Sequence, residues 1–146
     1  MPVSDEKDMI MKERPSIPVL VVEDSPICQI VVRNLLEEIG CTVTLAETVG
    51  EGFKCIKQAD ASGVLFQALI TDYDLPDATG VDLAEAIRAS NFLHKNMLIA
   101  CMSALMNEER RSRCNLVGID AAFSKPIRAD DISALFKKQG VMEGAI

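Results

Sequence analysis

The chain has 146 residues, of which 49% are hydrophobic and 25% charged, and its formal net charge is −7 at pH 7. This length and composition predict one globular domain and exclude a disordered chain, while the acidic balance without a basic cluster argues against direct nucleic-acid binding. No apolar run approaches the roughly 20 residues of a membrane span, and no secretory signal is visible at the N-terminus. We therefore expect a cytoplasmic protein without direct membrane contact.

Residues 1–16 are polar and are expected to form a flexible lead-in or linker. A domain over residues 17–140 follows, and residues 141–146 form a tail. Within the domain, short apolar runs typical of buried strands alternate with helical segments. The predicted strands are 19–22, 41–46, 67–72, 97–102 and 121–124. The predicted helices are 26–39, 49–59, 81–89, 107–116 and 130–138, with a loop at 61–64.

Continuous apolar strands alternating with helices predict a parallel sheet covered on both faces. Right-handed crossovers then give a doubly wound, flavodoxin-like α/β fold with five strands in the order 2-1-3-4-5 and five helices. In this order the first and third strands are neighbours. Glu23 and Asp24 follow the first strand and Asp72 ends the third, so their carboxylates are expected to meet at the switch point of the sheet.

Three carboxylates this close repel one another, and their proton affinities rise unless a cation neutralises them. Mg²⁺ prefers oxygen ligands and commonly uses one or two carboxylates together with phosphate oxygens. The sequence therefore predicts a divalent metal site here, although a single Asp after a strand is most often a cap or turn residue. Two further polar side chains follow strands. Ser103 comes after the fourth strand. Lys125 comes after the fifth strand and directly before Pro126, and its ammonium would reach a phosphoryl oxygen or pair with Asp72. Taken alone, such a Ser is mostly a helix cap and such a Lys a surface residue.

Other reactive side chains give weaker signals. The five cysteines form no CxxC pair and are expected to be reduced, mostly buried thiols. His94 is the only histidine and lies in a polar connection. We expect it at the surface without a catalytic role, because neither a carboxylate partner nor an amphipathic helix accompanies it in the sequence.

With these motifs the chain resembles the receiver domain of two-component response regulators and hybrid histidine kinases over about residues 17–139. The motifs stand in the order of that family: Glu23–Asp24; Asp72 with Pro76 and Gly80 after it; Ser103–Ala104; and Gly118 followed by Lys125–Pro126. The segments 25–27 and 123–127 look more like receivers of hybrid kinases than like those of DNA-binding regulators.

The resemblance implies a phosphorelay function. Asp72 would accept a phosphoryl group from the phosphohistidine of a histidine kinase or histidine phosphotransfer protein, and the domain would then switch conformation. Ser103 and Lys125 would each contact a phosphoryl oxygen, in agreement with the positioning and charge neutralisation that phosphoryl transfer requires. The resemblance also implies a cis peptide bond before Pro126. The implied Mg²⁺ ligands are Asp24, Asp72, the backbone carbonyl of Asp74, and Glu23 acting through water.

Three positions depart from the family pattern. Glu23 stands where Asp is commoner, and its longer side chain is expected to reach through a water. Ala122 stands where most members carry an aromatic residue, and Phe123 should face the other side of its strand. Asp74 adds a carboxylate beside the site and would alter the lifetime of the phosphoryl group.

The first half of the first helix carries apolar residues over more than the stripe of about 100° that an amphipathic helix needs. Some should be exposed beside the reactive site, where an apolar patch indicates a partner surface; the alternative is a wider buried face. We expect this face to dock the helical bundle that bears the donor histidine. Its residues are Ile27, Cys28, Ile30, Val31 and, after the fifth strand, Pro126.

Other functions start from the same residues. Asp72-Tyr73-Asp74 resembles the Asp-x-Asp motif of haloacid-dehalogenase-type phosphohydrolases, but it ends the third strand where that motif ends the first. A degenerate receiver that serves only as a protein-binding module, and a flavodoxin-like electron carrier, share the architecture. The favoured reading is a signalling domain and not an enzyme, apart from its own phosphorylation and dephosphorylation. We expect a single-domain regulator, a relay intermediate or a receiver from a larger protein.

Overall fold

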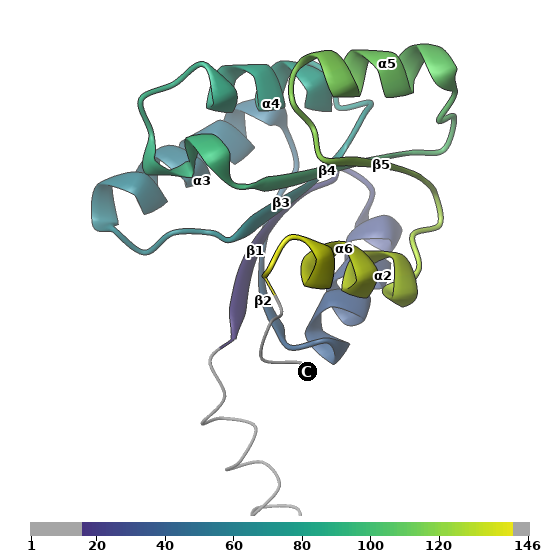
Figure 1. The fold of residues 1–146 in the computed structure, drawn as a ribbon, viewed down its shortest axis with the longest axis horizontal. Helices are drawn as coiled ribbons and strands as arrows, with labels where there is room; N and C mark the ends of the chain where they lie inside the picture. Colours follow the sequence, from purple (N-terminus) through teal and green to yellow (C-terminus); the bar gives the residue numbers. More distant parts are fainter. Residues whose placement is uncertain (1–15, 142–146) are drawn as a thin grey trace, which may run out of the picture.

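A parallel sheet of five strands lies at the centre of the fold in the computed structural model, which describes residues 16–141 (Figure 1). The strands are β1 (Ile17–Val22), β2 (Cys41–Ala46), β3 (Ala68–Asp72), β4 (Leu98–Ser103) and β5 (Ala121–Ser124). Their order is β2-β1-β3-β4-β5, which confirms the predicted topology. Ser103, expected just after the fourth strand, is its last residue.

Helices cover both faces of this sheet. They are α2 (Pro26–Glu38), α3 (Val49–Ser62), α4 (Gly80–Arg88), α5 (Glu108–Leu116) and α6 (Ala129–Lys138), with a short 3₁₀ helix η1 (Leu93–Asn96). Figure 1 shows α2 and α6 on one face and α3, α4 and α5 on the other. The doubly wound arrangement is therefore confirmed. Among the described residues, no helix combines the length and apolar character that crossing a bilayer requires.

The two faces of the sheet build two apolar cores. Val19 and Val21 of β1 pack on the α2 and α6 side, whereas Leu20 and Val22 pack on the α3, α4 and α5 side, and all four side chains are fully buried. Burial on both faces explains why the strands read as continuous apolar runs and not as an alternation. The cysteines are free thiols, three of them buried and two half-buried: Cys41, Cys101, Cys114, then Cys28 and Cys55.

The loop from β3 to α4 folds back tightly over the end of its strand. The amide of Gly80 donates to the carbonyl of Tyr73 at 2.9 Å, and a Cβ at Gly80 would come 2.3 Å from the carbonyl oxygen of Asp72. Only glycine fits this approach. At the tip of the loop, the carboxylate of Asp77 accepts hydrogen bonds of 2.9 Å from two amides at the N-terminus of α3. The loop is thus fixed at both its base and its tip.

Two expectations from the sequence are wrong, at the end of α3 and in the segment before β4. Ala61 and Ser62, predicted to lie in a loop, belong to α3, because the helix stops only where Gly63 adopts a left-handed conformation with φ of 77° and donates to the carbonyl of Ala59. Glycine in this conformation is a common helix terminator.

The short helix η1 was not predicted. The predicted lead-in 1–16 and tail 141–146 lie outside the described residues, apart from Ser16 and Val141.

His94 is buried and not at the surface as predicted. Its side chain is 1% exposed. Its Nε2 accepts a hydrogen bond of 3.0 Å from the amide of Phe66, and its Nδ1 lies 3.0 Å from Oδ1 of Asp60. Because Nε2 is an acceptor, the proton sits on Nδ1 and is donated to the carboxylate. The carboxylate partner exists, but it is 34 residues away in the chain.

We predict that His94→Ala lowers the free energy of unfolding by about 2–3 kcal/mol, because it leaves a cavity and an unpaired amide at Phe66 and removes the side-chain hydrogen bond to Asp60. Urea unfolding followed by circular dichroism measures the change. Leu93→Ala is the matched control, because that neighbouring side chain is 67% exposed and should cost less than about 0.5 kcal/mol. Equal effects of the two substitutions would contradict the structural role of His94.

Candidate functional site

Three carboxylates meet at the carboxyl ends of β1 and β3. The two strands pair in parallel with Val22 opposite Thr71, so the residues that follow emerge side by side. Glu23 is fully buried, Asp72 is 6% exposed and Asp24 is exposed. One carboxylate oxygen from each of these three residues lies within 4.8 Å of the others. This is the acidic cluster expected from the sequence.

Lys125 supplies a positive charge to this cluster. Its Nζ lies 3.1 Å from both carboxylate oxygens of Glu23 and 3.2 Å from Oδ2 of Asp72. The side chain reaches there from the end of β5, past β4, and the peptide bond between Lys125 and Pro126 is cis, as the resemblance implies. Burial alone would lower the pKa of Lys125, but the hydrogen bonds and negative charges of Glu23 and Asp72 outweigh it and raise that pKa.

One ammonium does not balance three carboxylates. The pKa of Asp72 rises from its ordinary value of 3.8 to about 6. Burial is the largest cause, followed by the hydrogen bond to Glu23 and the negative charge of that residue, while Lys125 acts in the opposite direction. A cation bound between carboxylates is the usual remedy for such crowding, and a set of carboxylate oxygens is the donor chemistry that Mg²⁺ prefers.

Ser103 lies fully buried at the end of β4, beside the end of β3. Its Oγ accepts hydrogen bonds of 3.0 Å from the amide of Leu105 and from Nη1 of Arg110. The same Nη1 donates to Oδ2 of Asp74 at 2.7 Å. The carboxylate of Asp74 therefore faces Arg110 and lies outside the acidic cluster of the described residues; the expected role of its backbone carbonyl as a ligand stays a prediction.

Arg110 is the site residue that the sequence did not indicate. It lies in the first turn of α5, and its guanidinium carbon is 4.2 Å from the ring centroid of Tyr73. Its partner Asp74 is 36 residues away in the chain, so no local spacing reveals the pair. The only hint of Arg110 in the sequence was the additional carboxylate of Asp74. A further negative charge beside an acidic site needs a positively charged partner.

The side chains of Ala122 and Phe123 on β5 point to opposite faces of the sheet, as expected from the sequence. Phe123 packs on the α2 and α6 side, and Ala122 faces the side of α5. Nη1 of Arg111 donates to the carbonyl oxygen of Ala122 at 2.7 Å, and a hollow of about 320 Å³ borders this residue. No aromatic side chain of β5 is therefore available beside Ser103.

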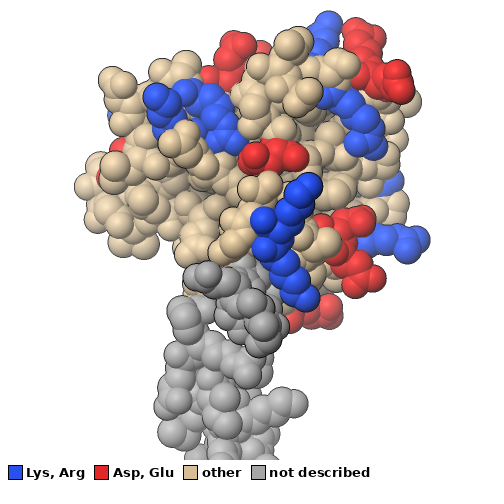
Figure 2. Space-filling model, viewed as in Figure 1, with Lys and Arg blue, Asp and Glu red and all other residues tan. Residues whose placement is uncertain are grey.

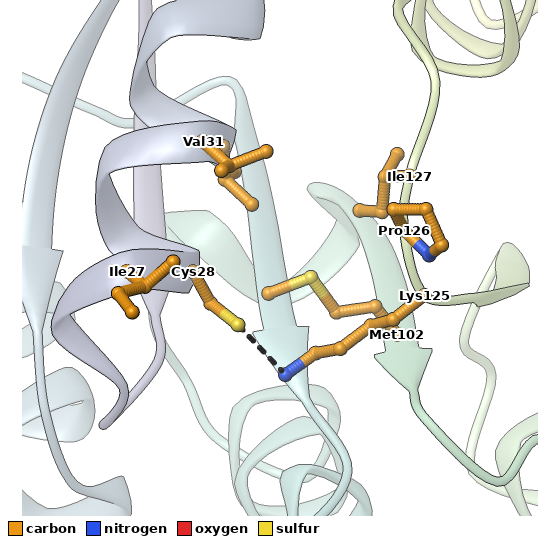
Figure 3. Close-up of a pocket in the computed structure, with 8 residues that line it drawn as sticks. Ile27, Cys28, Val31, Met102, Lys125, Pro126 and Ile127 are labelled. Atoms are coloured by element: carbon orange, nitrogen blue, oxygen red, sulfur yellow. Dashed lines mark hydrogen bonds between the residues drawn. The ribbon is translucent and has the colours of Figure 1, made fainter.

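An apolar groove of about 300 Å³ lies next to Lys125, between α2 and the segment after β5 (Figure 3). Ile27 and Val31 of α2 line it together with Pro126 and Ile127, and Sγ of Cys28 lies 3.8 Å from Nζ of Lys125. The predicted exposure of the α2 face is confirmed. Ile27 is 75% exposed, and Ile30 and Val31 are also exposed, although Ile30 does not line the groove. On the face in Figure 2, acidic and basic side chains are interspersed and no broad basic area is visible.

The family model of the response regulator receiver domain matches residues 19–137. The chain belongs to this family. Receiver domains are domains of two-component signalling, and the aerobic respiration control sensor protein ArcB of Escherichia coli is 28% identical over 134 residues, which cover 92% of this chain and 16% of ArcB. The two-component response regulator ARR15 of Arabidopsis thaliana is 27% identical over 139 residues, which cover 89% of this chain and 65% of that protein. The chain therefore spans less than two thirds of each of these relatives.

Solved structures share the fold. The CheY-like receiver domain protein of Methanospirillum hungatei has a TM-score of 0.73 and 25% identity, over 86% of this chain and 94% of that chain. The receiver domain of a sensor histidine kinase from Pseudomonas aeruginosa has a TM-score of 0.74 and 23% identity, over 86% and 99% of the two chains, and that protein has a magnesium ion in its active-site cleft.

The raised pKa of Asp72 predicts an unusual pH dependence of stability. The folded protein holds this proton up to about pH 6, whereas the unfolded chain releases it near 3.8. Ionisation therefore favours the unfolded chain, and stability is lost as the pH rises through this interval. In buffer with a chelator, Asp72→Asn should raise the free energy of unfolding by about 2–3 kcal/mol at pH 7.5, and the gain should shrink towards pH 4.

Urea unfolding of both proteins across this pH range measures the effect. Asp130→Asn on the exposed first turn of α6 is the control and should not raise the free energy of unfolding. A gain in Asp72→Asn that is constant with pH would show that the pKa of Asp72 is not raised.

Proposed function

We propose that this domain is a phosphoacceptor of a two-component phosphorelay. Asp72 takes a phosphoryl group from a phosphohistidine with the help of Mg²⁺, and the domain then signals to a partner by a change of conformation. The observation that carries the proposal is the position of Asp72. It is a buried carboxylate with a raised pKa that belongs to the acidic cluster and contacts the ammonium of Lys125.

Asp72 is the nucleophile. Its carboxylate oxygen forms the bond to phosphorus as the bond between phosphorus and the histidine nitrogen breaks, and the imidazole leaves. Glu23, Asp24 and Asp72 would hold Mg²⁺, the first through water, together with the backbone carbonyl of Asp74. When bound, Mg²⁺ supplies positive charge that lowers the repulsion between the carboxylates and the incoming phosphoryl group.

Lys125 and Ser103 complete the phosphoryl site. The ammonium of Lys125 already contacts Oδ2 of Asp72, so it neutralises charge that accumulates on a phosphoryl oxygen attached there. The pairing of β3 with β4 brings Ser103 to the same edge of the sheet, where its hydroxyl would donate to another phosphoryl oxygen. Catalysis of this transfer is mostly positioning and charge neutralisation, which these fixed groups supply.

The phosphohydrolase alternative is less well supported. It needs the second carboxylate of Asp72-Tyr73-Asp74 as acid and base, but the carboxylate of Asp74 is paired with Arg110. The complete set of acidic, hydroxyl and ammonium groups also argues against a degenerate module that only binds proteins. We propose that the domain turns over no external substrate. The cytoplasmic location remains a prediction.

We propose a histidine kinase or a histidine phosphotransfer protein as the partner. The docking face is the exposed α2 surface with the groove beside Lys125, formed by Ile27, Cys28, Ile30, Val31 and Pro126. An apolar surface of this kind next to a reactive site fits a protein donor that must bring its histidine to Asp72.

The phosphoacceptor assignment predicts that Asp72→Asn abolishes labelling by phosphoramidate in the presence of Mg²⁺, because the amide is not a nucleophile. Intact-mass spectrometry detects the gain of one phosphoryl group in the parent protein. Asp130→Asn should label at the rate of the parent. Full labelling of Asp72→Asn would disprove the assignment.

A second variant separates the metal from the nucleophile. Asp24→Ala keeps Asp72 but loses a carboxylate of the cluster, so both its labelling and the rise in melting temperature on adding Mg²⁺ should be strongly reduced. An unchanged response to Mg²⁺ would remove Asp24 from the ligand set.

The docking face predicts that Ile27→Glu slows transfer at least tenfold from a phosphorylated histidine phosphotransfer domain that reacts with the parent protein, because a charge replaces an apolar contact near the centre of the interface. Labelling by phosphoramidate should stay within about twofold of the parent. Leu116→Glu, at an exposed site on α5, is the control and should affect neither reaction. Equal losses with both donors would show damage to the site and not to docking.

A further inference from the structure

Arg110 connects three residues that stand beside the phosphoacceptor. Its guanidinium lies over the ring of Tyr73, 4.2 Å from the centroid, and its Nη1 reaches Asp74 at 2.7 Å and Ser103 at 3.0 Å. Tyr73 and Asp74 directly follow Asp72 in the chain. One side chain of α5 is thus tied to the loop after β3 and to the end of β4.

The hydrogen bonds of Ser103 show what this contact does. A hydroxyl has one hydrogen to donate and two lone pairs to accept with. The amide of Leu105 and Nη1 of Arg110 occupy the two acceptor positions, each at 3.0 Å. Only the hydroxyl hydrogen of Ser103 remains free for a further hydrogen bond. Ser103 is therefore committed to donate, and a phosphoryl oxygen is an acceptor.

The position of Arg110 is itself fixed from several sides. Its backbone amide donates to Oδ1 of Asn107 at 2.8 Å, which caps the N-terminus of α5. The ring of Tyr73 is 5% exposed and forms a rigid surface beneath the guanidinium. The carboxylate of Asp74 binds the charged end. A planar guanidinium stacked on a ring and bound to a carboxylate has little freedom, so the donor to Ser103 is held in place.

We propose that Arg110 is a positioning residue for the phosphorylation of Asp72. Anchored by Tyr73 and Asp74, it fills one acceptor position of Ser103 and so directs the hydroxyl hydrogen to the phosphoryl oxygen. The proposal rests on the phosphoacceptor function of Asp72. It also gives Ser103 a direct connection to α5 in a chain whose β5 offers no aromatic side chain on that face.

The test is a double-mutant cycle on the rate of phosphoramidate labelling in Mg²⁺. Arg110→Ala should slow labelling about ten- to hundredfold, the range expected when a charge-assisted hydrogen bond is lost in the transition state. Ser103→Ala should also slow it. If Arg110 acts through the hydroxyl, the double variant should label within about twofold of Ser103→Ala alone.

Arg113→Ala is the matched control, because Arg113 is an exposed arginine on the same helix whose ion pair is with Glu109; it should label at the parental rate. Asp74→Asn frees one end of the guanidinium and should slow labelling less than Arg110→Ala does. Melting temperatures of all variants show whether any loss comes from unfolding.

The outcomes separate the two proposals. If the parent protein does not label at all, the phosphoacceptor function fails, and this proposal fails with it. If the parent labels and Arg110→Ala labels equally fast, only the role of Arg110 is overturned. If Arg110→Ala slows labelling by the same factor with and without the hydroxyl of Ser103, the arginine acts by charge or by fold, and positioning through Ser103 is overturned.

Discussion

The contact of one ammonium with two buried carboxylates holds the functional edge of this domain together. Lys125 lies within 3.2 Å of both Glu23 and Asp72, and it joins the ends of β1, β3 and β5. Without it, two carboxylates that have almost no contact with solvent would face each other. Even with it, the site carries excess negative charge, and the pKa of Asp72 is raised. A bound cation would neutralise this excess charge, and the carboxyl group with the raised pKa is Asp72, the phosphoacceptor that we propose.

The remaining fold supports this edge from both sides. The second half of β1, residues 19–22, is fully buried and fixes where Glu23 emerges, and the pairing of β1 with β3 fixes Asp72 beside it. Asp77 binds the tip of the β3–α4 loop to the start of α3. Glu23 and Asp72 thus lie at the ends of rigid elements, where packing prevents small displacements of the proposed phosphoacceptor and its neighbour.

The architecture and the acidic cluster could be predicted from the sequence, because both depend on local patterns. Apolar runs alternate with helices, and Glu23, Asp24 and Asp72 stand at strand ends that the strand order makes neighbours. His94 and Arg110 could not, because their partners Asp60 and Asp74 are 34 and 36 residues away. Such pairs depend on how the loops pack, and no periodicity encodes that. The end of α3 was predicted too early, because the helix continues through Ala61 and Ser62 and stops only at Gly63.

The close approach of Gly80 to Asp72 limits how the chain can change in length. Residues 73–79 form a closed loop, with the amide of Gly80 bound to Tyr73 and a bridge between Asp74 and Thr79. An inserted residue would break these contacts and move Asp74 away from Arg110. The connection at 63–65 has no such closure, and Val64 there is 72% exposed. The amide of Phe66 after it is bound to His94. We expect insertions and deletions among close homologues to collect at 63–65 and to be absent from 73–79.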